Sequence, residues 1–217
     1  MMKTGHCACA ALIAAALLAP IAAFAAEPWT REPKDFRGVP FGASRAEARA
    51  ALDPGHSPDI AQRLTCTDGL LKDAKFMRQL SPSLRETMER EERERGTCSV
   101  MVAEIGPVMT KQTFTFHDDR FVQVELTFSS ARFETLRDIF VERYGPPVSE
   151  TTETVKTKAG ASFENTVLLW TGEKVDVELR RYGGTIDSGA ALVADRTWLD
   201  AEAKRRDAEK KKAAASF

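Results

Sequence analysis

The sequence predicts an α+β fold in which helices pack on one face of an antiparallel sheet. From residue 100 to residue 128, apolar side chains recur mostly with period two, as in strands that bury one face. Residues 133–144 instead carry apolar side chains at spacings of three and four, which is typical of an amphipathic helix. Strand-like segments follow again after residue 147. Blocks of strands separated by one helix favour α+β and exclude the βαβ alternation of a nucleotide-binding crevice.

Length and composition indicate the number of domains and exclude some classes of partner. The chain has 217 residues, of which 43% are hydrophobic, so one domain or two small ones with a full apolar core are expected. The 31 Lys and Arg residues nearly balance the 32 Asp and Glu residues. This balance excludes a strongly basic nucleic-acid binder and an acidic disordered chain, and we expect no nucleic-acid partner.

The first 25 residues have the pattern of a secretory signal peptide. Lys3 precedes the apolar stretch 8–24, and the small-residue site Ala23-Phe24-Ala25 ends it. A retained membrane anchor is the alternative, but the stretch is alanine-rich and near the lower length limit of a span. We therefore predict a signal peptide over 1–25, a single α+β domain over 26–200 and a charged helical tail over 201–217. The protein is expected to be periplasmic or secreted.

The first elements of the mature chain are predicted from turn and capping residues. Residues 36–41 alternate enough for a short strand, although Gly38 and Pro40 place it at an edge or a bulge. Ser44 and Glu47 have the spacing of a capping box, which predicts a helix ending near Leu52.

Removal of the signal peptide leaves two cysteines, Cys66 and Cys98. In an exported chain, two cysteines most simply form one disulfide, whereas a catalytic thiol would need a reduced cysteine beside a base. The segment 60–96 is helical in character, and Ser81-Pro82 interrupts it as an N-cap followed by proline at the first helical position. Its second half consists mostly of interleaved Glu and Arg. The sequence thus predicts a disulfide-stapled helical excursion.

The remaining elements follow from hydrophobic period and turn chemistry. Strands are expected over 100–105, 112–117, 120–128, 148–156, 163–171, 174–182 and 190–194. The pair Asp118-Asp119 predicts the turn of a hairpin, and Ser129 or Ser130 is expected to cap the helix that ends at Gly145. A terminal helix is expected to begin at Asp195 or Thr197 and to fray near residues 210–212.

Two short motifs carry a family resemblance. Phe41-Gly42-Ala43-Ser44 leads into a helix, and Tyr144-Gly145-Pro146-Pro147 ends a helix before a run of strands. In these features the chain resembles uncharacterised exported bacterial proteins, the outer-membrane assembly proteins of the SmpA/BamE type, and the β-lactamase-inhibitor fold. The resemblance implies helices combined with antiparallel strands. It transfers no site residue, because the lipidated cysteine of SmpA/BamE-type proteins has no counterpart here.

Three polar clusters are candidate binding sites, each with a structural alternative. His117, Asp118 and Asp119 offer metal ligands but also suit a hairpin turn. Arg180 and Arg181 precede a glycine-rich loop over 183–189, which suits an anion or a plain strand connection. The basic tail over 204–212 suits peripheral contact with an anionic membrane surface, or a solvated helix end.

No catalytic motif of the H-E-x-x-H or G-x-S-x-G kind occurs in the sequence. We therefore expect a non-enzymatic accessory or protein-interaction module, with no cofactor and no metal, whose partner is another envelope protein. The alternative is a small-ligand-binding protein, or a hydrolase that uses isolated carboxylates, with its cleft between the sheet and the helix over 130–144.

Overall fold

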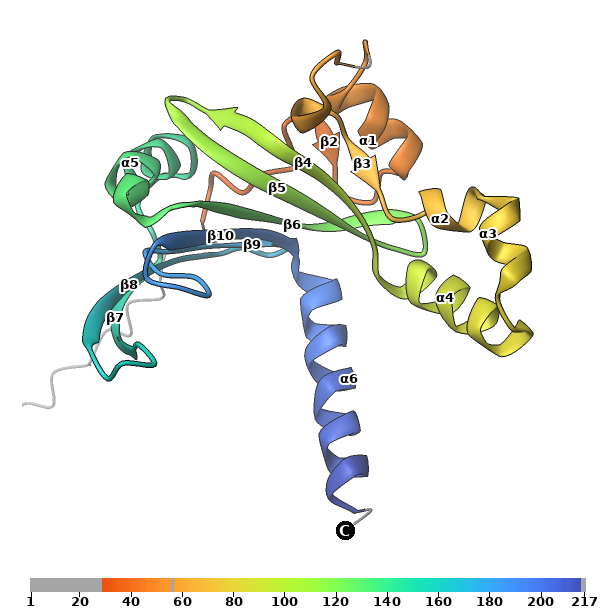
Figure 1. Cartoon of the computed structure of the whole chain (residues 1–217). Coiled ribbons are helices and arrows are strands. Elements are labelled where there is room, and N and C mark those ends of the chain that lie inside the picture. The colour runs from red at the N-terminus through yellow and green to blue at the C-terminus, as the bar shows by residue number, and fades with distance from the viewer. Residues whose placement is uncertain (1–28, 56, 216–217) are drawn as a thin grey trace, which may run out of the picture.

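The computed structural model describes residues 29–55 and 57–215, and an antiparallel sheet of eight strands organises this part of the chain (Figure 1). The strand order is β3-β4-β5-β6-β10-β9-β8-β7. The strands are β3 (Thr65–Cys66), β4 (Gly96–Ile105), β5 (Val108–His117), β6 (Arg120–Ser129), β7 (Ser149–Lys156), β8 (Ser162–Thr171), β9 (Val175–Arg180) and β10 (Ser188–Asp195). The α+β prediction is confirmed, and the predicted signal peptide lies outside the described residues.

Helices occupy three places around this sheet. They are α1 (Arg45–Leu52), α2 (Gly69–Lys72), α3 (Ala74–Gln79), α4 (Pro82–Arg95), α5 (Phe133–Tyr144) and α6 (Arg196–Ala214). In Figure 1, α1 and α5 lie on one side of the sheet, and α6 leaves from the other side. The helices α2 to α4 form an excursion between β3 and β4. None of the helices in the described part of the chain is both long and apolar enough to cross a membrane.

The strand predicted over 36–41 is instead a small separate hairpin of β1 (Asp35–Phe36) and β2 (Val39–Pro40). The reason is the turn between them: Arg37 and Gly38 both have positive φ, at 54° and 81°. Two such residues make the tight turn that joins antiparallel strands. The capping box of α1 is confirmed, because the Glu47 amide donates to Ser44 Oγ and the Ser44 amide donates to Glu47 Oε2.

The excursion between the cysteines is broken into three helices rather than two. Asp73 caps α3 by accepting from two backbone amides, and Ser81 caps α4 with Pro82 in its first turn, as predicted. Among the side chains of α2, α3 and α4 that the structure describes, Met77 alone is buried. The excursion therefore has almost no core of its own.

Two meanders and the short edge strand β3 make up the sheet, and one long-range strand pair joins the meanders. The first is β4-β5-β6, whose hairpin turn has Asp118 and Asp119 at φ of 49° and 59°, as the turn prediction requires. The second is β7-β8-β9-β10, with the polar β7 at the sheet edge. Because β10 pairs with β6, α5 must carry the chain from the centre of the sheet to its far edge.

The helix α5 covers the apolar face of the sheet. Its buried side chains are Phe133, Leu136, Phe140 and Tyr144. The rings of Phe140 and Trp170 lie 6.1 Å apart, and Trp170 Nε1 donates to the carbonyl of Gly145 at 2.9 Å. Aromatic side chains thus fill the space between sheet and helix in which the alternative function would place its cleft.

The start of α5 differs from the prediction of a serine cap. A short 3₁₀ turn over Ser130–Arg132 precedes the helix, and no side chain caps its first turn. Ser130 Oγ donates instead to the carbonyl of Ile186 at 2.7 Å. Its hydroxyl therefore ties the loop before β10 to the start of α5, a contact between distant segments that a local capping rule does not anticipate.

The terminal helix α6 begins as expected, with Asp195 accepting from the Trp198 amide at 2.9 Å. The helix continues to Ala214 and projects away from the sheet (Figure 1). Glu202 is its one buried residue in the described chain, and the carboxylate forms ion pairs with Arg95 of α4 and with Arg205.

Replacing Phe140 with alanine should lower the free energy of unfolding by about 3–5 kcal/mol, because the change removes a fully packed ring between α5 and the sheet. Urea denaturation of both chains measures the difference. A loss below about 1 kcal/mol would mean that α5 contributes little to the core.

Asp176 of β9 gives the protein a pH dependence of predictable sign. Burial raises the pKa of its carboxyl, although nearby Arg196 opposes the shift. The folded protein then binds this proton up to a higher pH than the unfolded chain, so this residue's contribution to stability falls as pH rises above the ordinary pKa of an aspartate. Asp176→Asn should therefore stabilise the protein at pH 7, and the gap between the two melting temperatures should shrink as pH falls below the ordinary pKa of an aspartate. An equal or lower melting temperature at pH 7 would contradict this.

Candidate functional site

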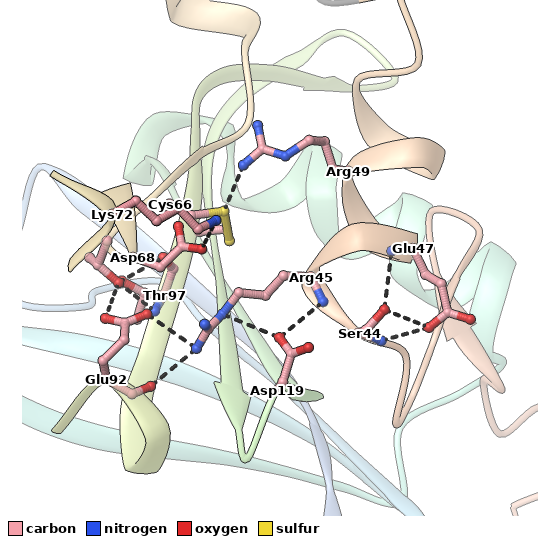
Figure 2. A network of polar contacts seen from close by, with 12 residues as sticks. Ser44, Arg45, Glu47, Arg49, Cys66, Asp68, Lys72, Glu92, Thr97 and Asp119 are labelled. Atoms are coloured by element: carbon pink, nitrogen blue, oxygen red, sulfur yellow. Dashed lines mark hydrogen bonds and ion pairs between the residues drawn. A yellow bond between two sulfur atoms is a disulfide. The ribbon is translucent and has the colours of Figure 1, made fainter. Parts of the chain in front are cut away.

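The cysteines staple the excursion at its base, as predicted. Cys66 and Cys98 lie directly opposite each other in β3 and β4 and form a disulfide across 32 positions of sequence. Cys98 is buried, whereas Cys66 is half-buried. In the chain-entropy model, closing such a loop stabilises the fold by about 3–4 kcal/mol. We call residues 67–95 the helical arm, and the polar contacts around its base the junction (Figure 2).

Arg45, from the first turn of α1, is the centre of the junction. Its Nη2 lies 3.1 Å from Glu92 Oε1 and donates at 3.1 Å to the carbonyl of the same residue. Its Nε lies 3.7 Å from Asp119 Oδ1, and its guanidinium stands over the ring of Phe116. The Arg45 and Glu92 side chains are only 16% and 13% exposed. Removing either partner would leave a largely buried charge, which is strongly destabilising.

The candidate cluster of His117, Asp118 and Asp119 lies at the junction and contacts the end of α4. The Asp118 amide donates to the carbonyl of Arg93 at 2.8 Å, and His117 Nδ1 lies 3.0 Å from the carbonyl of Glu94. The last carbonyls of a helix have no partner within the helix, so these contacts satisfy groups that would otherwise be unpaired. Within the described residues, no group of three or more His, Cys, Asp or Glu side chains is placed to hold a metal ion.

Gly96 allows α4 to run directly into β4. A Cβ atom at this position would overlap the Arg45 guanidinium and lie 2.6 Å from the carbonyl oxygen of Glu92. Its φ is −62°, so glycine is needed here for space and not for backbone conformation. The junction therefore closes only over a residue without a side chain.

Two further residues make contacts around the disulfide and the first residue of the arm. Thr67 Oγ1 donates to Glu92 Oε2 at 2.7 Å and accepts from the Thr97 amide at 3.0 Å. Arg49 of α1 donates to Cys66 Sγ at 3.4 Å and to the carbonyl of Leu64 at 3.1 Å. Figure 2 shows these side chains converging from α1, β3, α4 and the β5–β6 turn. The junction is thus a point where four distant segments meet.

The second predicted cluster lies elsewhere and is engaged within the chain. Arg180 forms ion pairs with Glu178 and Glu153, and Arg181 pairs with Glu134 while standing over the ring of Phe133. The loop that follows is held by backbone contacts, which include the Gly183 amide donating to the Ser188 carbonyl at 2.7 Å. Arg180 therefore links β9 to β7, and Arg181 links the end of β9 to α5.

Sequence reasoning found Cys66, Cys98 and the residues of the turn, but it missed Arg45, Arg49, Glu92 and Gly96. Glu92 lies in a helix of alternating charges, where nothing in the sequence marks one glutamate as buried. Gly96 follows a long helix and has the spacing of an ordinary helix stop. Only the contact between Arg45 of α1 and Glu92 near the end of α4 gives these residues their role.

Gly96→Ala should lower the free energy of unfolding by about 1–3 kcal/mol and weaken amide protection in the arm, because Arg45 and Glu92 must move apart. Hydrogen exchange and urea denaturation measure the two effects. The matched control is Gly69→Ala in α2, where a Cβ meets nothing within 4 Å. This control should be neutral or slightly stabilising, since alanine favours helix. Equal behaviour of the two variants would show that the junction tolerates a side chain.

The comparisons with known proteins contribute no further site residue. No family model, no curated protein and no solved structure matches this chain.

Proposed function

We propose that the chain is an exported, non-enzymatic protein-interaction module whose helical arm binds another protein of the cell envelope. The observation that carries the proposal is the contrast between the arm and its attachment. The arm buries Met77 alone among its described side chains, yet a disulfide and a nearly buried ion pair hold it in place. A solvated loop does not require both a covalent bond and a nearly buried ion pair. We infer that the two together hold the surface of the arm in one orientation for binding.

The surface of the arm has the composition of a binding face. Phe76, Leu80 and Met88 are only half-buried, and Leu84 is 48% exposed. Interleaved Glu and Arg side chains of α4 surround this apolar seam. Interfaces commonly combine an apolar centre with a charged rim that selects the partner. The partner proposed here accordingly has an apolar patch flanked by charges of both signs.

The disulfide also supports the exported location. Disulfides form and persist in oxidising compartments and are rare in the cytosol. The proposal therefore includes cleavage of the segment 1–25 and a periplasmic or secreted mature protein. The resemblance to SmpA/BamE-type and β-lactamase-inhibitor-like domains, both combinations of helices and antiparallel strands, is part of the same proposal.

The alternative, a small-ligand-binding protein or hydrolase in the cleft between the sheet and α5, has less support. Phe140, Tyr144 and Trp170 pack against one another there, with ring centroids 5.3–6.2 Å apart. Carboxylates in that layer would have to displace the main aromatic cluster of the core.

Photo-crosslinking from the arm tests the proposal. The full chain, with a photoreactive residue in place of Leu84, is expressed in a bacterium and irradiated in the intact cell envelope. In the control chain, the photoreactive residue replaces the exposed Thr127 of β6. We expect one discrete adduct from position 84 and none from position 127. Leu84→Asp should weaken binding to the partner so identified at least tenfold, because it puts a charge at the apolar centre, and should leave the melting temperature unchanged.

Equal labelling from both positions, or unchanged affinity of the Leu84→Asp chain, would contradict the role of the arm.

The same preparation tests export, since the N-terminus of the recovered chain should lie at or within a few residues of Ala26. A chain that retains Met1 and sediments with membranes would contradict the location.

A further inference from the structure

The two sulfur atoms of the disulfide differ in their surroundings. Cys98 is the third residue of β4 and is buried, whereas Cys66 lies in a two-residue edge strand and is half-buried. A surface hollow of about 470 Å³ lies between α1 and α2, and its lining carries Arg45, Arg49 and Lys72 together with Asp53 and Asp68. A thiolate that approaches the bridge from solvent therefore reaches Cys66, the more exposed of the two cysteines, first.

Arg49 lies beside Cys66 and would stabilise its thiolate, an effect that a purely structural disulfide does not need. Its Nη2 donates to Cys66 Sγ at 3.4 Å, and Nη1 is held by the carbonyl of Leu64 at 3.1 Å. A guanidinium held beside a sulfur atom stabilises the thiolate form. A stabilised thiolate is a better leaving group, and a disulfide whose reduced form is stabilised is easier to reduce.

The state of this bridge decides how firmly the arm is attached. Strand β3 pairs with β4 over Thr65 and Cys66 only, so the backbone ladder at the base of the arm is very short. Without the bridge, the start of the arm is held by the Thr67 amide, which donates to the carbonyl of Thr97 at 2.9 Å, and by Thr67 Oγ1, which accepts from the Thr97 amide. The end of the arm keeps the nearly buried Arg45–Glu92 pair and the contacts of Asp118 and His117 with the last carbonyls of α4. Opening the bridge therefore loosens the start of the arm first.

We propose that the Cys66–Cys98 disulfide is a redox latch, which a dithiol reductant opens at Cys66 to release the helical arm. One thiolate of the dithiol attacks Cys66 Sγ, the bond to Cys98 breaks, and Cys98 leaves as a thiolate that takes up a proton. The second thiol of the reductant then attacks its own sulfur in the mixed disulfide and expels Cys66 as a thiolate beside Arg49. The reductant is oxidised to a disulfide, and the protein gains two thiols. The inference rests on the proposed function, because it regulates the surface assigned there.

Redox equilibration of the purified full chain with dithiothreitol, at varied ratios of its reduced and oxidised forms, tests the chemistry. We expect Arg49→Met to lower the equilibrium constant for reduction about tenfold, which corresponds to a potential about 30 mV more negative. Arg49→Lys keeps the charge and should stay within about threefold of the parent. One shared equilibrium constant for all three chains, or a bridge that opens only in denaturant, would overturn the latch.

Hydrogen exchange tests the structural consequence and separates it from the proposed function. Amides of residues 67–95 should lose at least tenfold of their protection in the reduced chain and in the Cys66→Ala/Cys98→Ala chain, while β5, β6 and β10 stay protected. An arm that stays protected in both chains would overturn the latch and leave the interaction module intact. An arm that is released on reduction, but never crosslinks from position 84 in either state, would instead refute the proposed function.

Discussion

Pairing of β6 with β10 is the interaction on which the rest of the structure depends. It runs from Ser129 opposite Ser188 to Gln123 opposite Ala194 and makes one sheet from two meanders. Val124 and Val193 lie opposite each other in this pair, both fully buried, so the seam between the meanders is also the middle of the core. Because the second meander must return from the far edge of the sheet, α5 crosses the apolar face and buries it. The hydrophobic core is therefore complete without α2, α3 or α4.

That completeness explains why the arm is fixed by polar and covalent contacts. In Figure 1, α1 and α5 lie on one side of the sheet, and the arm contacts the sheet mainly at its base, where the end of α4 meets β4 and β5. The junction therefore combines a disulfide, which removes freedom from the unfolded chain, with a nearly buried Arg45–Glu92 pair. A buried ion pair adds little net stability, but its geometry is demanding, and a broken one is costly. Its role here is to select one orientation of α4.

Sequence reasoning reached the parts of the fold that depend on local chemistry. The capping box at Ser44, the proline start of α4, the turn at Asp118-Asp119 and the disulfide each follow from residues close in sequence or from the cysteine count. It could not predict the β6–β10 pair, because strands with the same alternation of apolar side chains do not indicate which strands pair with each other. The junction was out of reach for the same reason. Nothing in the sequence marks Arg45, Glu92 and Gly96, because only the fold places Arg45 of α1 against Glu92 and Gly96 at the end of α4.

The junction also reaches the other projecting helix. Arg95, the last residue of α4, forms an ion pair with Glu202, and Glu202 is the residue that α6 buries at its base. Arg205 and Arg206 face the same carboxylate, so one glutamate fixes the start of α6 against the end of the arm. A movement of α4 at the junction must therefore either break this pair or move the base of α6 with it. Both outward helices are therefore attached through the junction, which also contains the Cys66–Cys98 disulfide.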